Sequence, residues 1–110
     1  MDRHWAQRPE ICRMDRDAVL SLWTTHKEER WPRVESQVEG PLMTLDTVIS
    51  GCVVYFLDSP EGLDTQRIRI LEDCVADLDN LTGELDEDCG FYFQRLRQLG
   101  ALLITTHHAI

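Results

Sequence analysis

The chain has few of the residues and motifs that catalytic and nucleotide-binding folds require. It has six glycines in 110 residues, none in a phosphate-binding loop, and no serine or cysteine in the setting of a nucleophile elbow. His107 and His108 are adjacent, so on a helix they point in different directions and do not form a metal-binding pair. A catalytic site would need residues such as Cys12, His26 and Glu28, which no sequence feature brings together. We therefore expect a protein that is not an enzyme and that uses no metal ion or cofactor.

Basic charge and long apolar runs are also scarce. Eleven Lys and Arg stand against 20 Asp and Glu, for a formal net charge of −9, and most of the excess lies in residues 41–110. Such a surface repels the phosphate backbone of nucleic acids. No apolar run approaches the length of a membrane span, and residues 1–9 lack the apolar core of a signal peptide. We expect a cytoplasmic protein that contacts neither nucleic acid nor membrane directly.

Residues 63–104 have the pattern of two helices joined by a short acidic turn. Leu63, Asp64 and Ile68 occupy the positions of a hydrophobic staple and an N-cap at the start of the first helix. Gly83 is expected to adopt the left-handed conformation that ends this helix. Apolar residues recur at steps of three and four in both segments: Ile68, Leu71, Val75 and Leu78, with Leu85 seven residues further and Thr82 at the intervening position, then Tyr92, Leu96, Leu99 and Leu103. The pattern predicts an antiparallel helical hairpin.

A helix is also predicted near the start of the chain. Met14, Asp15 and Val19 repeat the spacing of a staple and a cap. Apolar residues then follow at helical intervals, and Pro32 discourages continuation. This pattern indicates a helix over residues 16–30.

The most apolar segment lies between these regions. Residues 32–41 are polar and bounded by prolines, which is typical of a connector. After Pro41, one helical face is apolar at Leu45, Val48, Ile49, Cys52, Val53 and Phe56. Residues 52–57 are rich in β-branched and aromatic residues, so a buried strand is the competing interpretation there. We expect a helix because the pattern is long.

Together these segments predict an all-α fold. It is a small four-helix bundle whose last two helices form an antiparallel hairpin, in a single domain over residues 1–110. Residues 1–13 are expected to form an irregular N-terminal arm. Cys52, Cys74 and Cys89 lie on or beside apolar stripes, where a reduced thiol behaves as a small hydrophobe. Cys12 is the candidate for an exposed thiol.

The acidic turn is the first candidate for a binding surface. Leu81 occupies a ligand position of the calcium-loop pattern, which argues against a calcium site. Negative charge before the last helix is explained in part by the helix dipole, and the same cluster suits a basic surface on a partner. The candidate partner-binding residues are Asp79, Glu84, Asp86, Glu87 and Asp88.

Aromatic and surplus apolar residues give two further candidates. Trp23, Trp31, Tyr55 and Tyr92 would suit a pocket for a cationic or apolar ligand if they face each other around a void; otherwise they fill the core. Residues at the edges of the last two apolar stripes are candidates for self-association into a homo-oligomer: Ile70, Leu81, Phe91 and Leu102.

The sequence therefore favours a non-enzymatic intracellular module that binds another protein, such as an adaptor, a regulator or a toxin-neutralising protein. Its acidic and apolar helical surfaces would make the contact. The alternative is a sensor or carrier that binds a small cationic or apolar ligand in the bundle. The identity of the partner protein does not follow from the residues.

Overall fold

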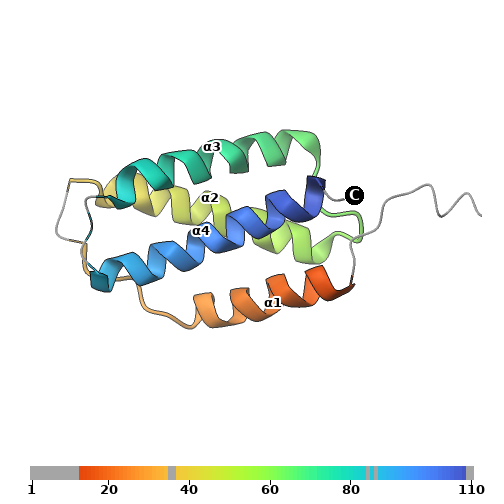
Figure 1. Cartoon of the computed structure of the whole chain (residues 1–110), viewed down its shortest axis with the longest axis horizontal. Helices are drawn as coiled ribbons and strands as arrows, with labels where there is room; N and C mark the ends of the chain where they lie inside the picture. Colours follow the sequence, from red (N-terminus) through yellow and green to blue (C-terminus); the bar gives the residue numbers. More distant parts are fainter. Residues whose placement is uncertain (1–12, 35–36, 84, 86, 109–110) are drawn as a thin grey trace, which may run out of the picture.

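The computed structural model describes residues 13–34, 37–83, 85 and 87–108. The described chain forms four helices, α1 (Arg13–Lys27), α2 (Glu39–Asp58), α3 (Thr65–Thr82) and α4 (Glu87–His108), and contains no strand within these residues. The helices run side by side along one axis (Figure 1). The predicted all-α four-helix bundle is confirmed, and residues 52–57 are helical.

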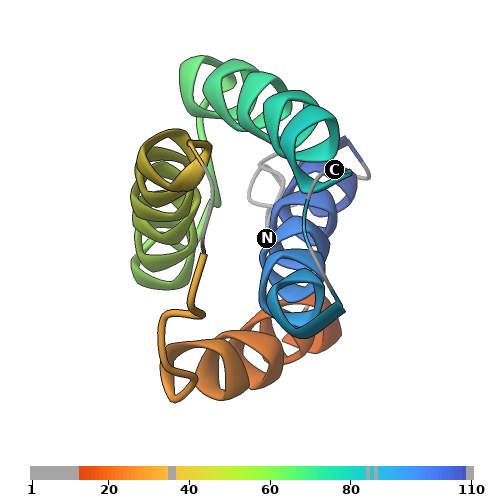
Figure 2. The ribbon, with the colours of Figure 1, turned by 90° about the vertical axis from the view of Figure 1, so that its left-hand side faces the viewer.

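The four helices form a ring in chain order around a common core. Seen from one end, α1, α2, α3 and α4 follow one another around the bundle, and α4 closes the ring against α1 (Figure 2). Consecutive helices are antiparallel neighbours, so the predicted hairpin of α3 and α4 is present (Figure 1). All four helices contribute side chains that are almost wholly buried, among them Val19, Ile49, Phe56, Leu71, Leu78, Phe93, Leu96 and Leu99.

The start of α3 follows its sequence signature. Asp64 has an extended backbone conformation, and its Oδ1 atom accepts a hydrogen bond from the Arg67 backbone amide at 2.8 Å. Leu63 and Ile68 are both buried, as expected for a hydrophobic staple.

The predicted left-handed residue at Gly83 was wrong. Gly83 has a right-handed conformation (φ −62°), and the turn tightens through a hydrogen bond from the Leu85 amide to the Thr82 carbonyl at 3.1 Å. Because that bond already satisfies a terminal carbonyl, no left-handed cap is needed. The glycine with positive φ is instead Gly62 (81°), in the turn that leads from α2 into α3.

Helix α1 begins and ends three residues earlier than residues 16–30. Asp15 therefore lies within the first turn and is not the N-cap, although its carboxylate still lies near the positive end of the helix dipole. The chain leaves the helix after Lys27 through hydrogen bonds from the Glu28 and Glu29 amides to carbonyls one turn back. This early exit lets Trp31 turn inward, where its ring is half-buried.

Helix α2 begins earlier than expected and includes the last residues of the predicted connector 32–41. The Leu42 amide donates to the Val38 carbonyl at 2.9 Å, so Gly40 and Pro41 lie in the first turn. Proline is tolerated there because the first amides of a helix have no partner within the helix. By length and composition alone α2 also qualifies as a membrane span, a test that the core helix of a bundle passes equally well.

Gly100 sets the distance between α3 and α4, and this gives a first testable prediction. A Cβ atom at Gly100 would lie 2.7 Å from Cγ2 of Val75, a stiff β-branched side chain. We expect Gly100→Ala to lower the free energy of unfolding by about 1 kcal/mol, because overpacking outweighs the gain in helix propensity. Urea denaturation measures this, and adding Val75→Ala should reverse the loss. A stabilised single variant would contradict the close approach.

Candidate functional site

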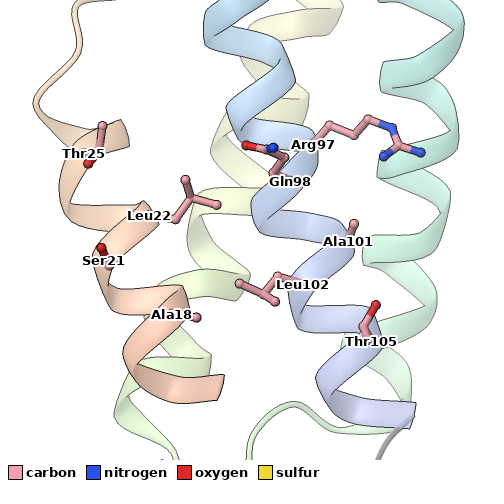
Figure 3. A pocket seen from close by; sticks show the side chains of 9 residues that line it. All are labelled: Ala18, Ser21, Leu22, Thr25, Arg97, Gln98, Ala101, Leu102 and Thr105. Atoms are coloured by element: carbon pink, nitrogen blue, oxygen red, sulfur yellow. The ribbon is translucent and has the colours of Figure 1, made fainter. Parts of the chain in front are cut away.

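A groove runs along the outer surface between α1 and α4 (Figure 3). Its volume is about 700 Å³. Small side chains line both sides, with Ala18 and Ser21 on α1 and Ala101 on α4, and they leave the space open. Leu22 and Leu102 extend from the two helices into the space between them and form its apolar floor (Figure 3).

Exposed apolar side chains continue the groove at both ends. Met14 is 78% exposed and Phe91 is 64% exposed, the two highest values among the large hydrophobic residues of the described chain. Met14 precedes Ala18 by one helical turn, and Phe91 precedes Gln98 by two, so each lies in line with lining residues. Because α1 and α4 are antiparallel (Figure 1), Met14, near the start of α1, and Phe91, near the start of α4, belong to opposite ends of the bundle.

The two edges of the groove differ in charge. On α1, Asp17 and Ser21 are exposed and share one helical edge, with Arg13 one turn before Asp17, and Glu28 is exposed directly after the end of the helix. On α4, Arg97 donates to both carboxylate oxygens of Asp79 on α3, with an Nη2–Oδ2 distance of 3.2 Å. The Arg97 charge is therefore engaged across the α3–α4 contact, and the α1 edge is acidic.

The predicted acidic partner site is described only in part. Asp79 is bound to Arg97. Glu84 and Asp86 lie outside the described residues. Glu87 and Asp88 are the first two residues of α4, where negative charge suits the helix dipole, but their side chains are outside the described part.

The predicted aromatic pocket separates into two places. Trp23, Trp31 and Tyr92 gather with His26 and Phe93, ring against ring, with centroid distances such as 4.5 Å for His26–Tyr92 and 5.5 Å for Trp31–Tyr92. Tyr55 lies apart from them, with the Arg67 guanidinium 3.8 Å from its ring centroid. The structure thus brings together three of the four predicted rings.

Beneath these rings lies a polar cluster that the sequence analysis missed. Oδ1 of Asp46 accepts a hydrogen bond from the Tyr92 hydroxyl at 3.1 Å and lies 3.3 Å from Nε2 of His26. Burial, and then the Asp46 charge, raises the pKa of the Tyr92 hydroxyl. His26 is 3% exposed, and its Nδ1 has no hydrogen-bond partner among the described residues. A signal was present, since Asp46 is the one charged residue in residues 40–57.

A second contact that the sequence did not reveal ties α1 to the end of α2. The Arg16 guanidinium donates to the carbonyls of Phe56, Leu57 and Ser59 at 2.9, 3.1 and 2.6 Å. Phe56 and Leu57 lie in the last turn of α2, where carbonyls have no amide four residues on within the helix. The Phe56 carbonyl also accepts from the Ser59 amide, and the Ser59 carbonyl from the Gly62 amide. Arg16 also lies over the Phe56 ring, 5.0 Å from its centroid.

The described cysteines occupy core positions. Cys52 and Cys74 are buried free thiols, and burial raises the pKa of both. Both therefore stay protonated and behave as small hydrophobes, as predicted. Cys89 belongs to α4, but its side chain and all of Cys12 lie outside the described residues. Within the described part, no group of three His, Cys, Asp or Glu residues has the arrangement of a metal site.

The predicted self-association residues lie on two different surfaces. Leu102 lines the α1–α4 groove, and Phe91 extends the same stripe of α4. Ile70 is exposed on α3, and Leu81 lines a small depression between α3 and α2. The four residues therefore do not form one patch.

Comparison of the chain with protein-family models, with curated proteins and with solved structures finds no match. The functional argument therefore depends on the site itself. An open groove between two antiparallel helices, with an apolar floor and exposed apolar ends, is suited chemically to the burial of one face of another helix.

Proposed function

We propose that this protein is a non-enzymatic protein-binding module that takes an amphipathic helix of a partner protein into the α1–α4 groove. The main supporting observation is that Met14 and Phe91, the most exposed large hydrophobic residues of the described chain, share helical stripes with residues that line the groove. A helix laid in the groove would cover both, together with Leu22 and Leu102. Large exposed apolar side chains in one line are typical of interaction sites.

The charge of the chain specifies the chemistry of the partner. The α1 edge presents Asp17 and Glu28, and the whole chain has a formal net charge of −9. A helix with a narrow apolar stripe flanked by Lys or Arg would meet complementary charge along that edge. An adaptor, a regulator or a toxin-neutralising protein would work through such a contact.

The small side chains that line the groove limit the shape of the partner. With Ala18, Ser21 and Ala101 along the two sides, a partner helix can approach the bundle closely and place side chains at i, i+3, i+4 and i+7 over Leu22 and Leu102. A long side chain at Ala101 would fill this space.

A peptide selection tests the proposal. A displayed library of random 18-residue peptides is selected against the full chain, and the bound peptides are sequenced. We expect enrichment of sequences with helical apolar spacing and flanking Lys or Arg, and loss of their binding to an Ala101→Arg variant by at least tenfold, measured by fluorescence anisotropy. Phe91→Asp should weaken binding in the same way.

Ala76→Arg is the matched control, because it makes the same substitution at an exposed position of α3 that does not line the groove. It should bind the selected peptides as the unmodified chain does. Equal binding to the Ala101→Arg variant, or enrichment of acidic or extended peptides, would contradict the proposal.

A further inference from the structure

The outer side of α2 lies, with its border to α3, on the far side of the bundle from the α1–α4 groove (Figure 2). Its α2 part is uncharged, and Arg67 and Asp77 of α3 lie at its border. We call it the α2/α3 face and define it by Met43, Thr47, Gly51, Val54, Tyr55 and Ile70. Four of these are among the seven large hydrophobic residues that are exposed in the described chain. Asp46, the charged residue within this stretch of α2, turns inward to Tyr92 and His26. A chain with a net charge of −9 therefore has an α2 side without charge from Met43 to Tyr55.

A depression of about 350 Å³ lies at one end of this face, between α2 and α3. Thr44, Leu45 and Leu81 line it, together with Asp77 at its rim. Tyr55 is exposed near the other end of α2. Thr44 and Tyr55 are eleven residues, or about three turns, apart, so they lie on the same side of α2, about 16 Å from each other.

We propose that a second copy of this chain docks on the α2/α3 face with α2 antiparallel to the α2 of the first copy. A two-fold axis that crosses α2 between positions 49 and 50 reverses the helix and keeps α3 opposite α3. It places Tyr55 of each copy over the depression of the other. Near the axis, Thr47 lies within one residue of the level of the other copy's Gly51. A Cβ atom at Gly51 would meet no side chain of the described residues within 4 Å, so the helices can approach closely.

The same operation pairs opposite charges. The Arg67 guanidinium covers the Tyr55 ring and donates to Asp64 of its own chain at 2.6 Å. Arg67 precedes the centre of the α3 contact by about as many residues as Asp77 follows it. Each Arg67 therefore lies beside the Asp77 of the other copy, at two equivalent places. This symmetry argues for a second copy over an unrelated partner, since the face complements itself in shape and in charge.

The size of the face is compatible with a stable dimer. Helix α2 has 20 residues, which corresponds to about 30 Å of helix, and two packed helices present a surface about 20 Å wide. The contact then covers on the order of 600 Å² per copy, close to the ~800 Å² of a standard-size interface.

Solution mass tests the dimer. Analytical ultracentrifugation of the full chain should give twice its mass of 12.8 kDa at micromolar concentrations. Val54→Arg, at a residue 46% exposed, should shift the mass to the monomer, whereas Leu20→Arg, at a residue 47% exposed on α1, should leave the dimer intact. A monomer for the unmodified chain, or a dimer that survives Val54→Arg, would overturn the proposal.

A charge exchange tests the pairing of the two copies. Arg67→Glu and Asp77→Arg should each weaken the homodimer at least tenfold, because each places like charges together at both contacts. An equimolar mixture of the two variants should form a heterodimer with affinity near that of the unmodified chain, since both contacts again join opposite charges. Formation of the heterodimer also shows that both variants fold. A mixture that stays monomeric, or homodimers that are unaffected, would refute this arrangement.

Discussion

Replacing Asp46 with alanine is expected to lower the free energy of unfolding by about 3 kcal/mol. Asp46 lies on α2 and binds Tyr92 of α4 and His26 of α1 through the same carboxylate oxygen. Without it, the half-buried Tyr92 hydroxyl and the buried Nε2 of His26 lose their partner together. Each unsatisfied buried polar group costs about 1–3 kcal/mol, and the two losses occur at once. Thermal and urea denaturation followed by circular dichroism measure the change.

Asp46→Asn is the matched control. An asparagine carbonyl in the same place accepts both hydrogen bonds, so the loss should be less than half of that for the alanine variant. Tyr92→Phe removes the hydroxyl that Asp46→Ala leaves without a partner. The double variant Asp46→Ala, Tyr92→Phe should therefore regain part of the stability. If the alanine and asparagine variants unfold at the same denaturant concentration, hydrogen bonding to Asp46 does not stabilise the bundle.

Replacing Arg16 with methionine is expected to lower the free energy of unfolding by about 2 kcal/mol. The guanidinium donates to three carbonyls at the end of α2, and its fork reaches them from α1, a helix that meets α2 through few other polar contacts of the described chain. Hydrogen bonds from a charged donor to carbonyls at a helix C-terminus are strengthened by the helix dipole. Methionine keeps most of the apolar packing against Phe56 while it removes the donors.

Arg16→Lys separates charge from geometry. An ammonium group retains the favourable interaction with the dipole but cannot reproduce the planar fork that reaches several carbonyls, so about half of the stability should be lost. Hydrogen exchange should show faster exchange at the end of α2 and the turn to α3 in both variants. Unchanged exchange there would contradict the role assigned to Arg16.

Helix α2 has one side in the core of the bundle and one side in the proposed dimer contact. Its inner side buries Leu42, Ile49 and Phe56 and directs Asp46 toward α1 and α4, while its outer side is uncharged from Met43 to Tyr55. Substitutions on the outer side, such as Val54→Arg, are therefore expected to change association and not stability. Substitutions at Asp46 should do the opposite, so the two kinds of variant distinguish folding from binding.

Much of the fold follows from local rules that the sequence displays directly. The staple and cap at Leu63 and Asp64 begin α3 as the residue types require, and the apolar steps of three and four place Leu71, Leu78 and Leu96 in the core. Helix ends were less well predicted because several local solutions compete there. At Gly83 the chain closes its turn with a right-handed residue, and at Pro41 the helix starts earlier because its first amides need no partner.

The candidate sites depend on which helices become neighbours, and a residue pattern does not specify that. The sequence by itself determined the four helices, their apolar faces and the acidic balance of the chain, because these depend on spacing and composition. Only the tertiary structure showed that Leu102 of α4 lies beside α1 and that Tyr55 lies apart from the rings of Trp23 and Trp31. It also showed that Asp46 contacts both His26 and Tyr92. These pairs are 20 or more residues apart in sequence or lie on different helices, so their contact is decided by how the helices pack and not by any local preference.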